Sequence, residues 1–288
     1  MRLALQPKTT LRNGLVIAFR GIVDHARTAT RKRDTARAIH DYRKSVRRAR
    51  ALLVMCKPLL SNGAYEELAG DLRDAHRLHS RLRDMDALLP VVQRLDAPKR
   101  LDRAKSAVAA ELETQKKSID PGLVEAMLVE GAARIEPVPN RLVEEFPNRV
   151  DMSAIVDGAC DTYRRARAAM RAARKHGRDR DVHDWRKRTK EFTYQLELLT
   201  AGRRGATRKL QREFDAMTEE LGAITDRMNL RDYVRSSAAL RGDPAAQELA
   251  ERVDAEAHQR MRRAFRRGEH AFRRKPRKFT SALFSLLK

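Results

Sequence analysis

The sequence contains one six-residue pattern twice, first as Ile39-His40-Asp41-Tyr42-Arg43-Lys44 and, 143 residues later, as Val182-His183-Asp184-Trp185-Arg186-Lys187. Both copies follow the order apolar, His, Asp, aromatic, Arg, Lys. The same offset aligns Arg47 with Lys190 and Leu53 with Leu196. Because six matching positions in one order are hard to obtain by chance, the repeat predicts a chain built from two similar halves.

Each copy predicts an amphipathic helix with one apolar and one basic face. At about 100° per residue, apolar side chains share one side of the two helices: Ile39, Tyr42, Val46, Ala49 and Leu53, then Val182, Trp185, Phe192 and Leu196, with Thr189 on the same face. The other side carries two basic stripes: His40, Arg43, Lys44 and Arg47 in the first, and His183, Arg186, Lys187 and Lys190 in the second. Within a stripe, successive turns place cations about 5 to 6 Å apart. A single stripe of this kind is usually a solvated face, whereas two matching stripes favour one long polyanion held between two halves.

The charge of the chain also indicates a polyanionic partner. The 288 residues include 62 Lys and Arg against 39 Asp and Glu, a formal net charge of +23, yet 42% of residues are hydrophobic. That hydrophobic content predicts a folded protein rather than a disordered polycation. Residues 1–150 contain 29 basic and 19 acidic residues, and residues 151–288 contain 33 and 20, so both halves are basic. Nucleic acid, inorganic polyphosphate and an anionic membrane are all possible partners at this point.

The composition predicts an all-α fold, because 13 Gly, 10 Pro and 5% aromatic residues accompany abundant Ala, Leu and Arg. Periodicity and breakers predict helices over residues 11–30, 35–57, 64–89, 98–118, 151–176, about 180–200, 208–221 or beyond, and 244–267. Asp34 is the expected cap of the second helix, Asn62-Gly63 a turn, Pro90 the end of the third helix, and Asp179 or Asp181 the cap of the sixth. Four prolines mark residues 121–147 as a connector, with one short helix over 123–130.

Cysteine usage and hydropathy predict a protein of the cytoplasm. Cys56 and Cys160 lie far apart among apolar neighbours, which favours two buried free thiols over a disulfide. The beginning of the chain has no apolar stretch long enough for a signal peptide, and no run of about 18 apolar residues occurs that would indicate a transmembrane helix.

With these motifs in view, the chain resembles the CHAD domain, the conserved-histidine α-helical domain, over roughly residues 8–284. The segment Leu82-Arg83-Asp84-Met85-Asp86 is similar to a further element of that family. The resemblance implies two four-helix bundles related by a pseudo-twofold axis around a central basic pore or groove, with residues 1–147 as the first half and 148–288 as the second. It also implies binding of inorganic polyphosphate, recruitment to polyphosphate granules and their proteins, no catalytic activity and no cofactor. The second half departs from the pattern, with Ile224-Thr225-Asp226-Arg227-Met228 at the equivalent place, which predicts an asymmetric pocket.

Carried over to this sequence, the resemblance makes the eight stripe residues the expected polyphosphate ligands. Arginine offers a forked pair of donors to phosphoryl oxygens, lysine a mobile point charge, and histidine one N–H donor or, once protonated, a cation. Binding is therefore expected to strengthen modestly as the pH falls. The secondary candidates are Arg31, Lys32, Arg174, Lys175 and Arg83, the last of which could instead form a structural ion pair with Asp86.

Three other interpretations are weaker. His76 and His79 lie three residues apart on one helix, but a shared metal ion would need an unusual third ligand. The Arg-rich segment before residues 279–287 could lie on a membrane, although an apolar strip of this length more often packs on its own bundle. A nucleic-acid-associated protein is the alternative function, with nucleic acid otherwise a non-specific competitor, and an enzyme is disfavoured because the stripes contain no carboxylates to position a metal.

Overall fold

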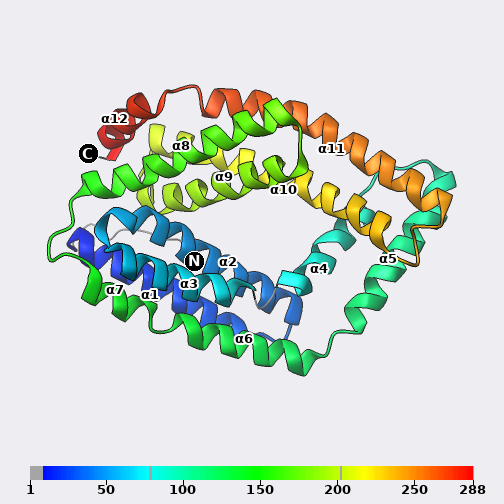
Figure 1. The fold of residues 1–288 in the computed structure, drawn as a ribbon, viewed down its shortest axis with the longest axis horizontal. Helices are drawn as coiled ribbons and strands as arrows, with labels where there is room; N and C mark the ends of the chain where they lie inside the picture. Colours follow the sequence, from blue (N-terminus) through cyan, green and yellow to red (C-terminus); the bar gives the residue numbers. More distant parts are fainter. Residues whose placement is uncertain (1–8, 78–79, 202, 288) are drawn as a thin grey trace.

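The computed structural model describes residues 9–77, 80–201 and 203–287, and these residues form helices with no β-strand, which confirms the all-α fold class. In chain order the helices are α1 Leu11–Thr30, α2 Thr35–Cys56, α3 Asn62–Arg77, α4 Ser80–Gln93, α5 Asp102–Lys117, α6 Pro121–Ile135, α7 Val138–Glu145, α8 Met152–His176, α9 Asp179–Leu199, α10 Ala206–Ser236, α11 Pro244–Ala271 and α12 Pro276–Leu287. Figure 1 shows α1 to α3 with α6 and α7 on one side of the molecule, and α8 to α12 on the other.

Short polar side chains begin several of these helices. The carboxylate of Asp34 accepts a hydrogen bond from the Arg37 backbone N–H at 3.1 Å, which confirms the predicted cap of α2. Asp243 caps α11 in the same way, through the backbone N–H of Ala245 at 2.9 Å. At the other end of a helix, α8 stops at Gly177, whose φ of 63° lies in the left-handed region that glycine tolerates.

Five local expectations were wrong. Asn62 and Gly63 form the first turn of α3 rather than a loop, and the predicted helix over 64–89 is divided between α3 and α4. Pro90 lies inside α4 because the flanking residues Leu88 and Val92 are buried, and their packing outweighs the lost hydrogen bond. The connector holds two helices, α6 and α7, each with a proline in its first turn, where no N–H is needed. Neither aspartate caps α9, which begins after Arg178.

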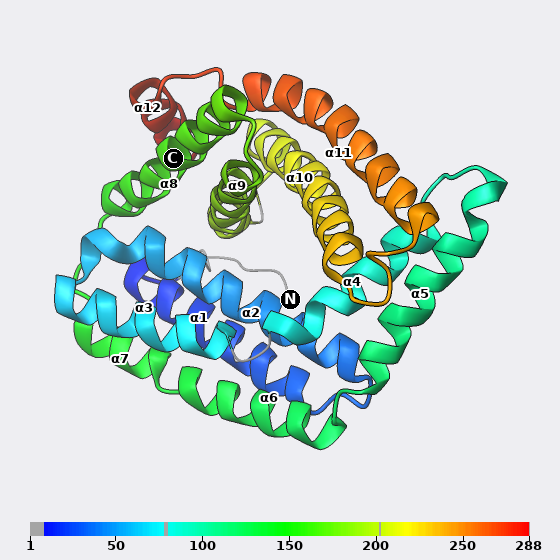
Figure 2. The same cartoon turned by 45° about the vertical axis from the view of Figure 1, so that its right-hand side comes forward.

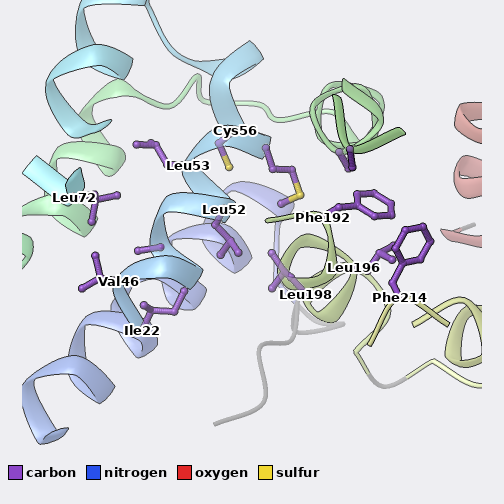
Figure 3. Close-up of a cluster of buried hydrophobic side chains, with 14 of the residues drawn as sticks. Ile22, Val46, Leu52, Leu53, Cys56, Leu72, Phe192, Leu196, Leu198 and Phe214 are labelled. Atoms are coloured by element: carbon purple, nitrogen blue, oxygen red, sulfur yellow. The ribbon is translucent and has the colours of Figure 1, made fainter. Parts of the chain in front are cut away.

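One large hydrophobic core joins the two sides of the molecule. It runs from Ile22 of α1 through Val46 and Leu52 of α2 to Phe192 of α9 and Phe214 of α10, and Figure 3 shows these side chains packed in one continuous series. The apolar faces predicted for both repeats are buried here, including Tyr42 and Trp185, which are both 0% exposed. The helical periodicity therefore identified the correct inward faces.

A second core joins distant parts of the chain. Leu88 and Val92 of α4 and Val108 and Leu112 of α5 pack with apolar residues of α10 and α11, among them Leu249. In Figures 1 and 2, α4 and α5 extend away from α1 to α3 to reach α10 and α11. Both cores thus contain residues from before and after residue 147. The proposed division of the chain at that residue, and the pseudo-twofold relation of two bundles, stay predictions.

The end of the chain packs on the protein's own helices. Phe279 of α12 stacks on Tyr163 of α8 with 3.8 Å between ring centroids, and Leu283 is fully buried. This is the docking that the sequence favoured for the apolar strip after the arginine cluster. Searched over the described residues, the helices include none with the length and hydropathy to span a bilayer.

Candidate functional site

A cavity of about 490 Å³ lies between α2, α3, α4, α9 and α10, and we refer to it as the central cavity. Helices α2, α9, α10 and α4 contact one another in that order, and residues of all four line the cavity. Figure 2 shows how these four helices are arranged. Its lining residues are His40, Arg43, Lys44, Arg47, Arg50, His76, Ala87, Arg186, Lys187, Lys190, Glu191, Tyr194, Asp226 and Asn229. The two basic stripes, which lie 143 residues apart in sequence, therefore face the same space.

The first basic stripe lies on α2 and is held by the packing of that helix against α3. The Tyr42 hydroxyl donates to the Ala75 carbonyl oxygen at 3.4 Å, on the buried face of α2. One position along, Arg43 is only 7% exposed, and its Nη1 donates to the His76 carbonyl oxygen at 3.4 Å. Arg43 is thus partly a structural residue, whereas Lys44 is half-buried and His40 is exposed on the cavity rim.

The second basic stripe contributes three residues of α9. The Arg186 guanidinium packs on α10, where a Cβ added to Gly222 would lie 4.0 Å from it. Lys190 lies over the Tyr194 ring, with its Nζ 4.9 Å from the ring centroid. Burial, together with the nearby charges of Arg47, Arg186 and Lys44, lowers the pKa of Lys190 to about 8. The charged form of Lys190 is therefore less stable in the empty cavity than in water, and a bound anion would stabilise it.

A buried polar junction between α2 and α9 sets the distance between the stripes. Arg48, 6% exposed, donates from Nη2 to both Glu197 carboxylate oxygens at 2.6 and 2.9 Å. Nearby, the Gln195 side-chain amide donates to the Ala51 carbonyl oxygen at 2.8 Å and to the Thr162 hydroxyl at 3.1 Å. Because these bonds join α2, α8 and α9, they fix the two basic walls relative to each other.

Several residues of the central cavity were not among the sequence candidates. Arg50 follows Arg47 by three positions, so extending the first basic stripe by one turn would have identified it. His76 was considered only as a metal ligand. Asp226 and Asn229 of α10 also line the central cavity. A helical wheel of one segment could not predict this, because it does not show which helices pack together.

The other candidates lie elsewhere. His183 does not line the central cavity, and burial, followed by the charge of Arg186, lowers its pKa. Lys32 forms an ion pair with Asp41, and Arg174 forms one with Glu269. Arg31 lines a different cavity, between α1, α6 and α7, and Lys175 is exposed at the end of α8. The side chain of Arg83 is outside the described residues, as are those of Asp84 and Asp86, so the expected asymmetry of that layer stays a prediction.

The central cavity has a strong excess of positive charge. Among the side chains that the structure describes, seven lysines and arginines line it, against two carboxylates, Glu191 and Asp226. Glu191 is also engaged by Arg188, whose Nη1 lies 3.2 Å from it. Over the described residues, no group of three or more His, Cys, Asp and Glu side chains is placed to hold a metal ion, and the side chain of His79 is outside those residues.

The two cysteines are free and buried, as the sequence predicted. Burial raises the pKa of both thiols, that of Cys160 to about 11. Neither cysteine lines the central cavity.

Comparisons with known proteins agree with this description. The family described as CHAD domain matches residues 17–235. The fold is similar to the crystal structure of the CHAD domain from the plant Ricinus communis, with a TM-score of 0.69 and 18% identity, covering 96% of each chain. It is also similar to PptA from Streptomyces chartreusis, with a TM-score of 0.61 and 16% identity, covering 92% of this chain and 100% of the other. No curated protein matches the sequence.

Proposed function

The chain belongs to the CHAD domain family, and on that premise we propose that it binds inorganic polyphosphate in the central cavity without turning it over. The observation that carries the proposal is the convergence of both basic stripes on one cavity, where the described side chains include seven lysines and arginines against two carboxylates. A polyanion would offset the mutual repulsion of these cations, including Lys190, whose pKa burial and the neighbouring cations lower to about 8.

The dimensions of the central cavity favour a thin, flexible chain over a nucleic-acid duplex. A cavity of about 490 Å³ lined by helices on several sides admits a linear phosphate chain. Duplex DNA is a stiff rod with a persistence length of about 50 nm and carries its phosphates on the outside, so it would meet only the rim. Nucleic acid is therefore proposed as a weak, salt-sensitive competitor.

A triple variant, Lys44→Gln, Lys187→Gln and Lys190→Gln, tests this proposal. These lysines line the central cavity, and replacing them leaves Arg43 and its structural bond to α3 in place. Three lost charge-assisted contacts predict a loss of affinity for long-chain polyphosphate of at least about 100-fold. The matched control replaces Lys99, Lys117 and Lys209, which are exposed and outside the central cavity, and is expected to bind like the parent. Equal affinity of both variants would place the site elsewhere.

A competition titration separates the two polyanions. Polyphosphate is expected to displace duplex DNA from the protein at matched phosphate concentration and about 150 mM salt, where the screening length is about 8 Å. If DNA is retained instead, the protein is a nucleic-acid-binding protein. We further propose that binding recruits the chain to polyphosphate granules in the cytoplasm. A fluorescent fusion should then gather on the granules, and the triple variant should stay dispersed.

A further inference from the structure

A second, smaller cavity adjoins the central cavity, and we refer to it as the side cavity. It measures about 130 Å³ and is lined by residues of α2, α3, α8 and α9. Arg50, Lys187 and Glu191 line both cavities, so the side cavity begins where the central cavity ends. The sequence repeat does not predict this cavity, because Arg73 of α3 and Arg165 of α8 lie outside the repeated segments.

The side cavity is also strongly basic. Among the described residues it is lined by Arg50, Arg73, Arg165, Lys187 and Arg188, against the single carboxylate of Glu191. Two of these cations also have a partner on their own helix: Arg165 lies 2.9 Å from the partly exposed Asp161, and Arg188 lies 3.2 Å from Glu191. For Arg50, Arg73 and Lys187, no ion pair is recorded within the described ranges 9–77, 80–201 and 203–287.

Arg50 is the residue that links the two cavities. It is half-buried, and burial lowers its pKa; the carboxylate of Glu191 opposes this shift, whereas the charges of Arg73 and Arg77 add to it. A desolvated cation that faces further cations is unfavourable in the empty protein. An anion at this position would remove the cost, which is the physical reason to expect a ligand here rather than a solvated surface.

We propose that the side cavity is the exit of the central cavity, through which a linear polyphosphate too long for the central cavity leaves over Arg50 and is held by Arg73 and Arg165. This inference rests on the proposed function and adds that the affinity for polyphosphate depends on the length of its chain. A short chain such as tripolyphosphate would be bound by the central cavity alone. A long chain would gain contacts with α3 and α8 as well.

The double variant Arg73→Gln and Arg165→Gln tests the exit. Its affinity for long-chain polyphosphate should fall about tenfold, and the slope of log affinity against log salt should decrease by about 1.4, the value for two phosphate contacts on a single-stranded chain. Its affinity for tripolyphosphate should stay within about twofold of the parent. The control replaces Arg103 and Arg241, which are exposed and line neither cavity, by glutamine, with the same change in net charge.

The outcomes separate this inference from the proposed function. If the central triple variant loses both ligands while the double variant keeps full affinity for the long chain, the exit is wrong and the central site stands. If the double variant loses tripolyphosphate as well, Arg73 and Arg165 act on the central cavity and the exit is also wrong. If the parent protein binds neither ligand, both proposals fail. The single variant Arg73→Gln is the control for misfolding of the double variant, because Arg73 is exposed on α3. It should lose part of the affinity for long-chain polyphosphate and none of the affinity for tripolyphosphate.

Discussion

Arg48 of α2 and Glu197 of α9 form an ion pair in which Nη2 of the guanidinium donates to both carboxylate oxygens, at 2.6 and 2.9 Å. Arg48 is 6% exposed and also lies over the Tyr194 ring, 5.5 Å from its centroid. The pair therefore joins the repeated helices at the level where their basic stripes face each other.

Glu197→Gln should destabilise the protein by about 1.5 to 3 kcal/mol, because it leaves the buried guanidinium of Arg48 without its charged partner. Urea unfolding followed by circular dichroism measures this. Glu251→Gln, on an exposed position of α11, is the control and should change the free energy of unfolding by less than about 0.5 kcal/mol. An unfolding free energy unchanged by Glu197→Gln would mean that the pair does not hold α2 to α9.

Affinity for polyphosphate should fall as the pH rises above 8. Burial and neighbouring cations hold the pKa of Lys190 at about 8 in the free protein, and a bound polyanion raises it. Below pH 8 the lysine is protonated in both states, so it adds no pH dependence there. Above pH 8 binding takes up a proton, and affinity falls by at most about tenfold per pH unit.

Titration calorimetry in two buffers of different ionisation enthalpy detects that proton. Lys190→Arg should remove the proton uptake and the fall in affinity, because arginine stays charged throughout this range. Proton uptake that persists in Lys190→Arg would assign the titration to another group. The sequence predicted that protonation of the stripe histidines strengthens binding as the pH falls. His183 does not support this expectation, because it lies outside the central cavity and its pKa is lowered.

Gly158→Ala should be strongly destabilising even though alanine favours helices. Gly158 of α8 faces the end of α2, and an added Cβ would overlap the carbonyl oxygen of Met55. Since that obstacle is backbone, the two helices must separate, at a cost of about 1 to 3 kcal/mol or more.

Gly70→Ala is the matched control, because Gly70 is also inside a helix and has no atom within 4 Å of the added Cβ. It should stabilise the protein by about 0.5 to 1 kcal/mol. Thermal unfolding of the two variants should therefore shift in opposite directions. A stabilised Gly158→Ala protein would contradict the close approach of α8 to α2.

Phe279→Ala should release α12 from the bundle. The Phe279 ring is 3% exposed and stacks on Tyr163 at an interplanar angle of 4°, beside Phe192. Loss of this ring should cost about 3 to 5 kcal/mol. Hydrogen exchange should show faster exchange over residues 276–287, whereas Ser281→Ala on the exposed face of α12 should leave it unchanged.

Incubation with polyphosphate and Mg²⁺ should release no phosphate. The described side chains that converge on the central cavity are mainly cations, and of the two carboxylates among them, Glu191 is engaged by Arg188. Phosphoryl transfer enzymes instead hold their metal with carboxylates beside the substrate. A colorimetric phosphate assay over hours at saturating ligand measures this, and steady release would reveal a catalytic centre.

The sequence predicted features that depend on local periodicity. The inward position of Tyr42 and Trp185 and the cap at Asp34 follow from spacing alone, and the structure confirms them. Seven of the eight stripe residues line the central cavity, but His183 does not. A helical wheel shows which face a residue occupies, but it does not show how far along α9 that face borders the cavity.

What the sequence could not predict depends on distant contacts. Pro90 is tolerated inside α4 only because Leu88 and Val92 pack against helices more than 100 residues later. The approach of Asp226 and Arg73 to the two cavities likewise depends on how separate helices are docked, which no single segment encodes.

The second core also constrains how the protein is made. Leu88 of α4 packs with α10 and α11 residues such as Leu249, which the ribosome adds only after the intervening 160 residues. At a synthesis rate of about 5 to 20 residues per second, the apolar faces of α4 and α5 stay exposed for roughly 10 to 30 s before α10 and α11 are made. During synthesis these faces are a natural target for chaperones. The duplicated segment is therefore a unit of sequence, while the cooperative unit of folding is the nearly complete chain.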